Sequence, residues 1–141
     1  LPTLNGGETR AIAVNDLGQV LVAESELGTY IWNPTNEISL VPIGGFTINN
    51  LEQIVGGTVG DPSIWDPING TQRLADFISR GAGWRLEIPF AINDAGDIVG
   101  YGVLNDQVRG FLLIPVPEPG FIPLAVLGSV FFAIRIRLRA H

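Results

Sequence analysis

The feature that most constrains the fold is an internal repeat. The segments AVNDLGQVLVAES, TINNLEQIVGGTV and AINDAGDIVGYGV each place an apolar residue before an asparagine and an aliphatic run after a short polar stretch. The anchoring asparagines are Asn15, Asn49 and Asn93. Their spacings are 34 and 44 residues. Recurrence at such intervals is typical of architectures in which each repeat is one supersecondary unit that buries its apolar face against the next.

The polar stretch of each segment has the composition of a tight hairpin turn. An Asx side chain can bond the backbone ahead of it, and glycine accepts positive φ. Glu52 stands where the other two segments have glycine, which weakens the turn prediction in the middle segment. The residues that we assign to these turns are Asn15, Asp16, Gly18, Asn49, Asn50, Asn93, Asp94 and Gly96.

A second apolar run follows each turn: TYIWNP, PSIWDP and RGFLLIP, each closed by a proline. Proline lacks a ladder donor and is confined to strand ends and edges, so these runs are predicted strands. We expect Trp32, Trp65 and Phe111 to play one structural role. Further strands are predicted at 38–43 and 85–90, whereas QRLADFIS has helical spacing.

Four short strands in a unit of about 40 residues is the proportion of a propeller blade. We therefore predict an all-β fold of antiparallel β-meander repeats in a 1–115 body, with about three propeller-like blades near 11–45, 46–80 and 85–115. The alternative is that the repeat reflects only the general sequence pattern of β-meanders, without a propeller. Since propellers close with about four to eight blades, three would be incomplete, and we expect the chain to be the C-terminal piece of a longer one.

The third segment carries a family resemblance. AINDAGDIVGYG, followed by RGFLLIP from Arg109, resembles the bacterial extracellular HAF-type repeat, and the likeness covers about residues 11–115. The resemblance implies a secreted repeat module. Because that family is not defined by a shared reaction, it supplies no catalytic residue.

Composition argues against several function classes. The 14 acidic residues outnumber the 8 basic ones, all of which are arginine, and an acidic body offers no basic stripe for nucleic acid. Cysteine is absent and His141 is the only histidine, so thiolate catalysis, a Ser-His-Asp triad and a zinc site lack their residues. We therefore expect no enzyme activity, no cofactor and no metal.

Two chemical alternatives stay open at the turns. Paired carboxylates among Asp16, Asp94 and Asp97 would suit glycoside hydrolysis. Asn93, Asp94 and Asp97 would offer oxygen ligands to calcium, although their spacing does not match the twelve-residue calcium loop. Local hydrogen bonding in a turn explains these residues sufficiently, and we favour that interpretation.

The last 26 residues, VPEPGFIPLAVLGSVFFAIRIRLRAH, differ from the acidic body. The prolines of the 116–119 linker hold the chain extended. Residues 121–134 lack a charge and would rise about 21 Å as a helix, and flanking arginine stems can snorkel. A buried core helix is the alternative. We predict a transmembrane helix at 120–134 and a basic cytoplasmic tail at 135–141, with the body on the extracytoplasmic side.

The order of these three parts resembles the PEP-CTERM sorting signal of bacteria that make extracellular polysaccharide. The resemblance implies recognition by an exosortase, a membrane protease that removes the tail. The recognition motif would be Pro117, Glu118 and Pro119, and the stop signal Arg135, Arg137 and Arg139. The membrane anchor would comprise Phe121, Leu124, Val126, Leu127, Val130, Phe131, Phe132 and Ile134.

Two functions follow as hypotheses. The first is a non-catalytic surface or matrix protein, exported, processed at its tail, and either attached to or released into extracellular polysaccharide. The second is the C-terminal portion of a larger secreted carbohydrate-binding or carbohydrate-active propeller. Exposed aromatic residues, such as Trp84 or Tyr101, would favour the second because they stack on sugars.

Overall fold

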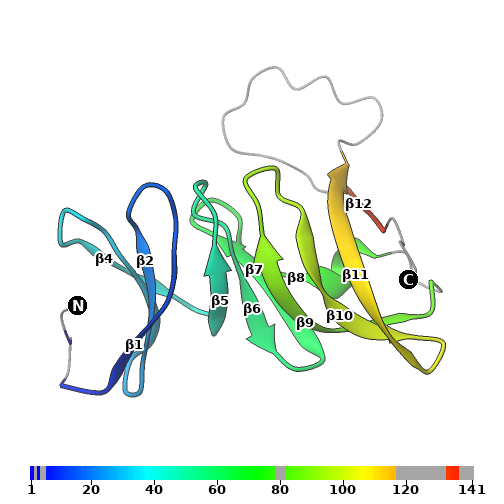
Figure 1. Cartoon of the computed structure of the whole chain (residues 1–141), viewed down its shortest axis with the longest axis horizontal. Coiled ribbons are helices and arrows are strands. Elements are labelled where there is room, and N and C mark those ends of the chain that lie inside the picture. Colours follow the sequence, from blue (N-terminus) through cyan, green and yellow to red (C-terminus); the bar gives the residue numbers. More distant parts are fainter. Residues whose placement is uncertain (2, 4–5, 79–81, 117–132, 137–141) are drawn as a thin grey trace.

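The computed structural model describes residues 1, 3, 6–78, 82–116 and 133–136, which form three antiparallel four-stranded sheets in chain order (Figure 1). We call these sheets units 1, 2 and 3. Unit 1 contains β1 (Thr9–Val14), β2 (Val20–Glu24), β3 (Gly28–Trp32) and β4 (Ile38–Val41). Unit 2 contains β5 (Gly45–Ile48), β6 (Ile54–Thr58), β7 (Asp61–Asp66) and β8 (Gly70–Arg73). Unit 3 contains β9 (Trp84–Ile92), β10 (Ile98–Leu104), β11 (Gln107–Val116) and β12 (Ala133–Ile136).

The all-β, antiparallel prediction is confirmed, and each unit is a meander in which consecutive strands pair. The units follow one another side by side, with the first strand of each near the first strand of the next, as in blades of a propeller (Figure 1). The described residues do not close into a ring. The segment with helical spacing forms only the short 3-10 helix η1 (Leu74–Phe77).

The predicted C-terminal helix is wrong at its end. Ala133–Ile136 forms β12, which pairs antiparallel with β11, so Ile134 and Arg135 lie in a strand opposite Pro115 and Ile114. Apolar and charged residues alternate there, which is the period of a strand, and β11 offers an edge to pair with. The rest of the predicted anchor lies outside the described residues. Within those described, no helix has the length and apolarity needed to cross a membrane.

Cross-strand pairing defines two rows of side chains in each unit, because residues directly opposite each other in an antiparallel pair share a face. The front rows are Val14, Val20 and Trp32 in unit 1, Ile48, Ile54 and Trp65 in unit 2, and Ile92, Ile98 and Leu113 in unit 3. The back rows are Ala13, Leu21 and Ile31, then Thr47, Val55 and Ile64, then Ala91, Val99 and Leu112.

The hydrophobic core lies between the units. One cluster joins Leu21 and Ile31 of the back of unit 1 to Ile48 and Ile54 of the front of unit 2. A second cluster joins the back of unit 2 to the front of unit 3 in the same way: Val55, Ile64 and Leu74 meet Leu86, Ile92, Ile98, Phe111 and Leu113. Fully burying one such aliphatic side chain contributes about 1.5–3 kcal/mol, so each unit depends on its neighbour for much of its stability.

The expectation of one shared role for Trp32, Trp65 and Phe111 is wrong for the third residue. Trp32 and Trp65 pair with Val20 and Ile54, the first residues of β2 and β6. The first residue of β10, Ile98, pairs with Leu113, whereas Phe111 pairs with Gly100 two positions along. Phe111 therefore fills space above a glycine, and its ring meets that of Trp84 edge-on at 6.5 Å.

The second strands of units 2 and 3 cross the first strands very closely at a glycine. A Cβ on Gly56 would lie 1.9 Å from the carbonyl oxygen of Gly44, and one on Gly100 would lie 2.2 Å from that of Ile88. Both obstacles are backbone atoms, which cannot rotate away as a side chain can. These two positions therefore require glycine for steric reasons.

Candidate functional site: the ladder of turns

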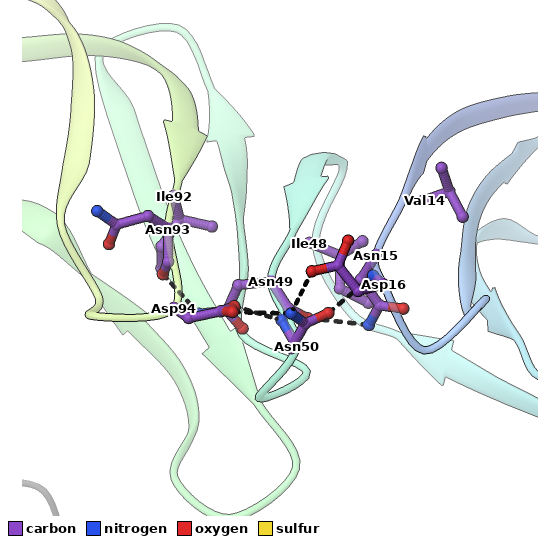
Figure 2. Close-up of a pocket in the computed structure, with 9 residues that line it drawn as sticks. All are labelled: Val14, Asn15, Asp16, Ile48, Asn49, Asn50, Ile92, Asn93 and Asp94. Atoms are coloured by element: carbon purple, nitrogen blue, oxygen red, sulfur yellow. Dashed lines mark hydrogen bonds between the residues drawn. The ribbon is translucent and has the colours of Figure 1, made fainter.

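The three predicted turns lie side by side and are joined by a network of polar side chains (Figure 2). Each turn joins the first and second strands of its unit, so the stacking of the units brings the turns together. They border a surface hollow of about 250 Å³. It is lined by Val14, Asn15 and Asp16 of unit 1, Ile48, Asn49 and Asn50 of unit 2, and Ile92, Asn93 and Asp94 of unit 3.

Within each turn, the first asparagine organises the backbone. The Oδ1 atom of Asn15 accepts hydrogen bonds from the amides of Leu17 and Gln19, at 3.1 and 3.0 Å. Asn49 holds Leu51 and Gln53 in the same way, at 3.0 and 2.9 Å, and Asn93 accepts from the amide of Asp97 at 2.9 Å. This is the Asx arrangement that the sequence predicted.

The middle turn keeps this geometry although it lacks glycine. Gly18 and Gly96 have φ of 75° and 84°, and Glu52 adopts φ of 57° at the same position. The left-handed conformation is strained for a residue with a side chain. The Glu52 carboxylate accepts a hydrogen bond from Gln19 Nε2 of unit 1, a contact that glycine could not make.

The same asparagines tie each turn to the next one. Asn15 Nδ2 donates to the backbone carbonyl of Asn49 at 3.0 Å, and Asn49 Nδ2 donates to that of Asn93 at 2.9 Å. The partners lie 34 and 44 residues apart in the chain. The repeated asparagine is therefore both a turn residue and a link between units.

A second line of bonds joins the residues that follow these asparagines (Figure 2). The amide of Asp16 donates to Asn50 Oδ1, and the amide of Asn50 donates to Asp94 Oδ1, both at 2.8 Å. The side-chain amide of Asn50 then donates to both acids, at 2.9 Å to Asp16 Oδ2 and 2.7 Å to Asp94 Oδ2. A neutral donor thus separates two carboxylates that would otherwise repel each other.

Every hydrogen-bonding group of the Asn49 side chain is engaged within the turns. Its side chain is 4% exposed, and both amide hydrogens and both lone pairs of the oxygen have partners. Gln19 and Gln53, also buried, accept from Asn15 Nδ2 and Asn49 Nδ2 at 2.6 and 2.7 Å. We call the whole set of bonds between and within the three turns the loop ladder.

The two chemical alternatives draw little support from this arrangement. Asp16 and Asp94 accept hydrogen bonds from Asn50, and Asp97 accepts one from Asn93 within its own turn, at 3.0 Å. In the part of the chain that the structure describes, no three His, Cys, Asp or Glu side chains are grouped to share a metal ion. The arrangement favours the turn interpretation of these residues.

Two pKa shifts lie away from the loop ladder. Burial, and then the charge of Glu24, raises the pKa of Tyr30 above its ordinary value. The hydrogen bond from Arg73 Nε to Asp61 Oδ1, at 2.7 Å, raises the pKa of the exposed Arg73 guanidinium. Neither group borders the hollow.

All eight predicted turn residues lie in the loop ladder. Sequence reasoning did not single out Gln19, Gln53 and Glu52 as site residues, although a Gln or Asp recurs four positions after each anchoring asparagine.

Arg135 lies in β12. The motif Pro117, Glu118 and Pro119, and the arginines Arg137 and Arg139, lie outside the described residues, as do the predicted anchor residues before Ala133.

Comparisons with known proteins identify no relative. No family model matches the chain, no curated protein matches it, and no solved structure matches it.

Proposed function

We propose that the body is a non-catalytic structural repeat module that is exported to the surface or extracellular matrix of a bacterium. The observation that carries this proposal is the loop ladder. Its buried polar side chains are engaged in holding one unit to the next, and Asn49 has no hydrogen-bonding capacity left for a substrate. Such a module would act through its surface and its shape and would catalyse no reaction.

The proposed route to the surface rests on the C-terminal sequence. A proline pair around Glu118, an apolar stretch and an arginine cluster follow one another in the order of a PEP-type sorting signal. An exosortase would cleave near the motif, after the apolar stretch has held the precursor in the membrane. Extracellular polysaccharide is the polymer that such a protein would meet.

Cleavage near the motif would change the edge of unit 3. It would remove β12 with the tail and leave β11 as the outer strand. In the intact chain β12 pairs with β11 opposite Pro115, so this proline does not by itself prevent pairing at the edge.

Mass spectrometry of the mature C-terminus tests the sorting proposal. The full chain, produced with an export signal, is compared in a host that has an exosortase and in the same host without it. We expect the residues after the motif to be lost only where the enzyme is present. Glu118→Gln should block the loss, whereas Glu26→Gln, an exposed acid in a β2–β3 turn, should not. An intact tail on wild-type surface protein would overturn the proposal.

One observation favours the carbohydrate-binding alternative. Phe90 is 59% exposed, and its ring lies 5.7 Å from that of Tyr101, which gives unit 3 an exposed aromatic platform of the kind that stacks on sugars. Trp84 does not join it, because it packs against Phe111 in the core. Loss of retention on a polysaccharide affinity gel in Phe90→Ala, but not in the exposed turn variant Ile68→Ala, would support this function.

A further inference from the structure

The front row of unit 1 is open at Val14, where its equivalents are closed, although Val22 and Tyr30, farther along the same face, are fully buried. Val14, Ile48 and Ile92 occupy the same position of the front row in units 1, 2 and 3. Ile48 and Ile92 are 5% and 8% exposed because the preceding unit covers them, whereas Val14 is 65% exposed. Trp32 lies in the same open row, and its indole Nε1 is buried without a hydrogen-bond partner among the described residues.

The last face is open in the complementary way. Leu21 and Val55, in the back rows of units 1 and 2, are fully buried by the unit that follows. Their equivalent in unit 3, Val99, is 43% exposed, and its cross-strand partner Leu112 is only half-buried. The surface that normally meets a front row is thus present and uncovered at this end.

The loop ladder also stops at both ends with unused positions. Asn15 and Asn49 each donate one hydrogen to the carbonyl of the next unit's asparagine. In the described part of the chain, Asn93 Nδ2 donates to Asp97 of its own turn, at 3.0 Å. The carbonyl of Asn15, at the other end, accepts from Gly18 within its turn and, among the residues that the structure describes, from no asparagine of another unit.

We propose that a second copy of this chain docks head to tail, with the front of its unit 1 against the back of unit 3. The apolar rows and the ladder would then continue across the junction as they do between units 1 and 2. Two copies supply six units, which falls within the four to eight that close a propeller. A heterologous junction that closes gives a discrete ring, so the expected assembly is a dimer with two identical junctions.

The charges at the junction predict how the dimer should respond to ionic strength. Inside the chain, the amide of Asn50 separates Asp16 from Asp94. At the junction, Asp94 would lie beside Asp16 of the other copy with no amide between them, and each chain carries a net charge of −6. Salt screens such repulsion, so the dimer should strengthen as ionic strength rises.

Analytical ultracentrifugation of the full chain tests the proposal. We expect a monomer–dimer equilibrium that shifts toward the dimer between low salt and about 0.5 M salt, where the Debye length falls below that at physiological ionic strength.

Val14→Glu and Val99→Glu should each weaken the dimer at least tenfold. Both side chains are exposed in the monomer, so circular dichroism should show an unchanged fold. Ile68→Glu, at a 71% exposed turn position of unit 2, is the matched control and should leave the dimer intact.

A charge exchange separates this junction from any other surface, including the tail. Val14→Glu and Val99→Lys should each fail to dimerise alone, but an equimolar mixture should associate, because one junction then pairs Glu with Lys and the other is wild type. A monomer at all salt concentrations would overturn the proposal. Association that survives both single substitutions would also overturn it, because the contact would then lie elsewhere. Neither outcome depends on how the tail is processed.

Discussion

Unit 2 and the two end units each form a four-stranded antiparallel sheet, but their surroundings differ. Ile48 and Val55 of unit 2 are buried on opposite faces, because unit 1 covers one and unit 3 covers the other. Their equivalents at the ends of the array, Val14 and Val99, are exposed. The difference shows that burial at these two repeat positions depends on the neighbouring unit, so the junctions contribute much of the stability, as in other repeat proteins.

The largest expected effect is at a strand crossing of the middle unit. Gly56→Ala should destabilise the chain by more than about 3 kcal/mol, because its Cβ would overlap the carbonyl oxygen of Gly44 and force a backbone shift. Gly110→Ala, in β11 of unit 3, meets only the carbonyl oxygen of Gly100 at 3.8 Å and should change stability by less than about 1 kcal/mol. Urea denaturation measures both. Equal losses would show that the crossing is not the constraint.

Equivalent residues of the front rows sharpen the comparison directly. Ile48→Ala should cost about 2–3 kcal/mol, since it leaves a cavity between units 1 and 2. Val14→Ala, at the same repeat position on the open end, should change the free energy of unfolding by less than about 0.5 kcal/mol. The measurement is urea denaturation at a concentration where the chain is monomeric. A similar loss for both would mean that the neighbouring unit does not decide burial.

The loop ladder gives a polar version of the same contrast. Asn49→Asp keeps the acceptor oxygen Oδ1. It replaces the buried NH₂ group, which donates to Gln53 Oε1 and to the Asn93 carbonyl, with a carboxylate oxygen, so two donors are lost. We expect a loss of about 2 kcal/mol. Asn93→Asp, in the exposed third turn, removes one donor to Asp97 and should cost about 1 kcal/mol or less. Thermal unfolding of both variants checks the order, and the reverse order would contradict the ladder.

The repeat made much of the fold predictable, because its turns and strands are local. The predicted strands at 38–43 and 85–90 appear as β4 and β9, and the Asx turns form as expected. The offset of Phe111 escaped prediction because β10 and β11 are longer than their equivalents and meet at a turn in which Asn105 and Asp106 have φ of 47° and 64°. Counting back two residues from each closing proline would have identified Leu113.

The remaining misses depend on contacts between distant residues. The alternation of Ile134, Arg135 and Ile136 is a local strand signal, but nothing local specifies pairing with β11, and the apolar residues before this segment favoured a helix. The bonds between turns join residues 34 and 44 positions apart, so their geometry depends on how the units stack. The recurrence of asparagine was visible in the sequence, but its second role as a link between units was not.

The central claim is that the turns bind one unit to the next. A double-mutant cycle on Asn50 and Asp94 tests it most directly, because their side chains belong to different units and meet at 2.7 Å. Unfolding free energies of Asn50→Ala, Asp94→Ala and the double variant should give a coupling of about 0.5–1 kcal/mol, as expected for an exposed charge-assisted hydrogen bond. A coupling indistinguishable from zero would contradict the account.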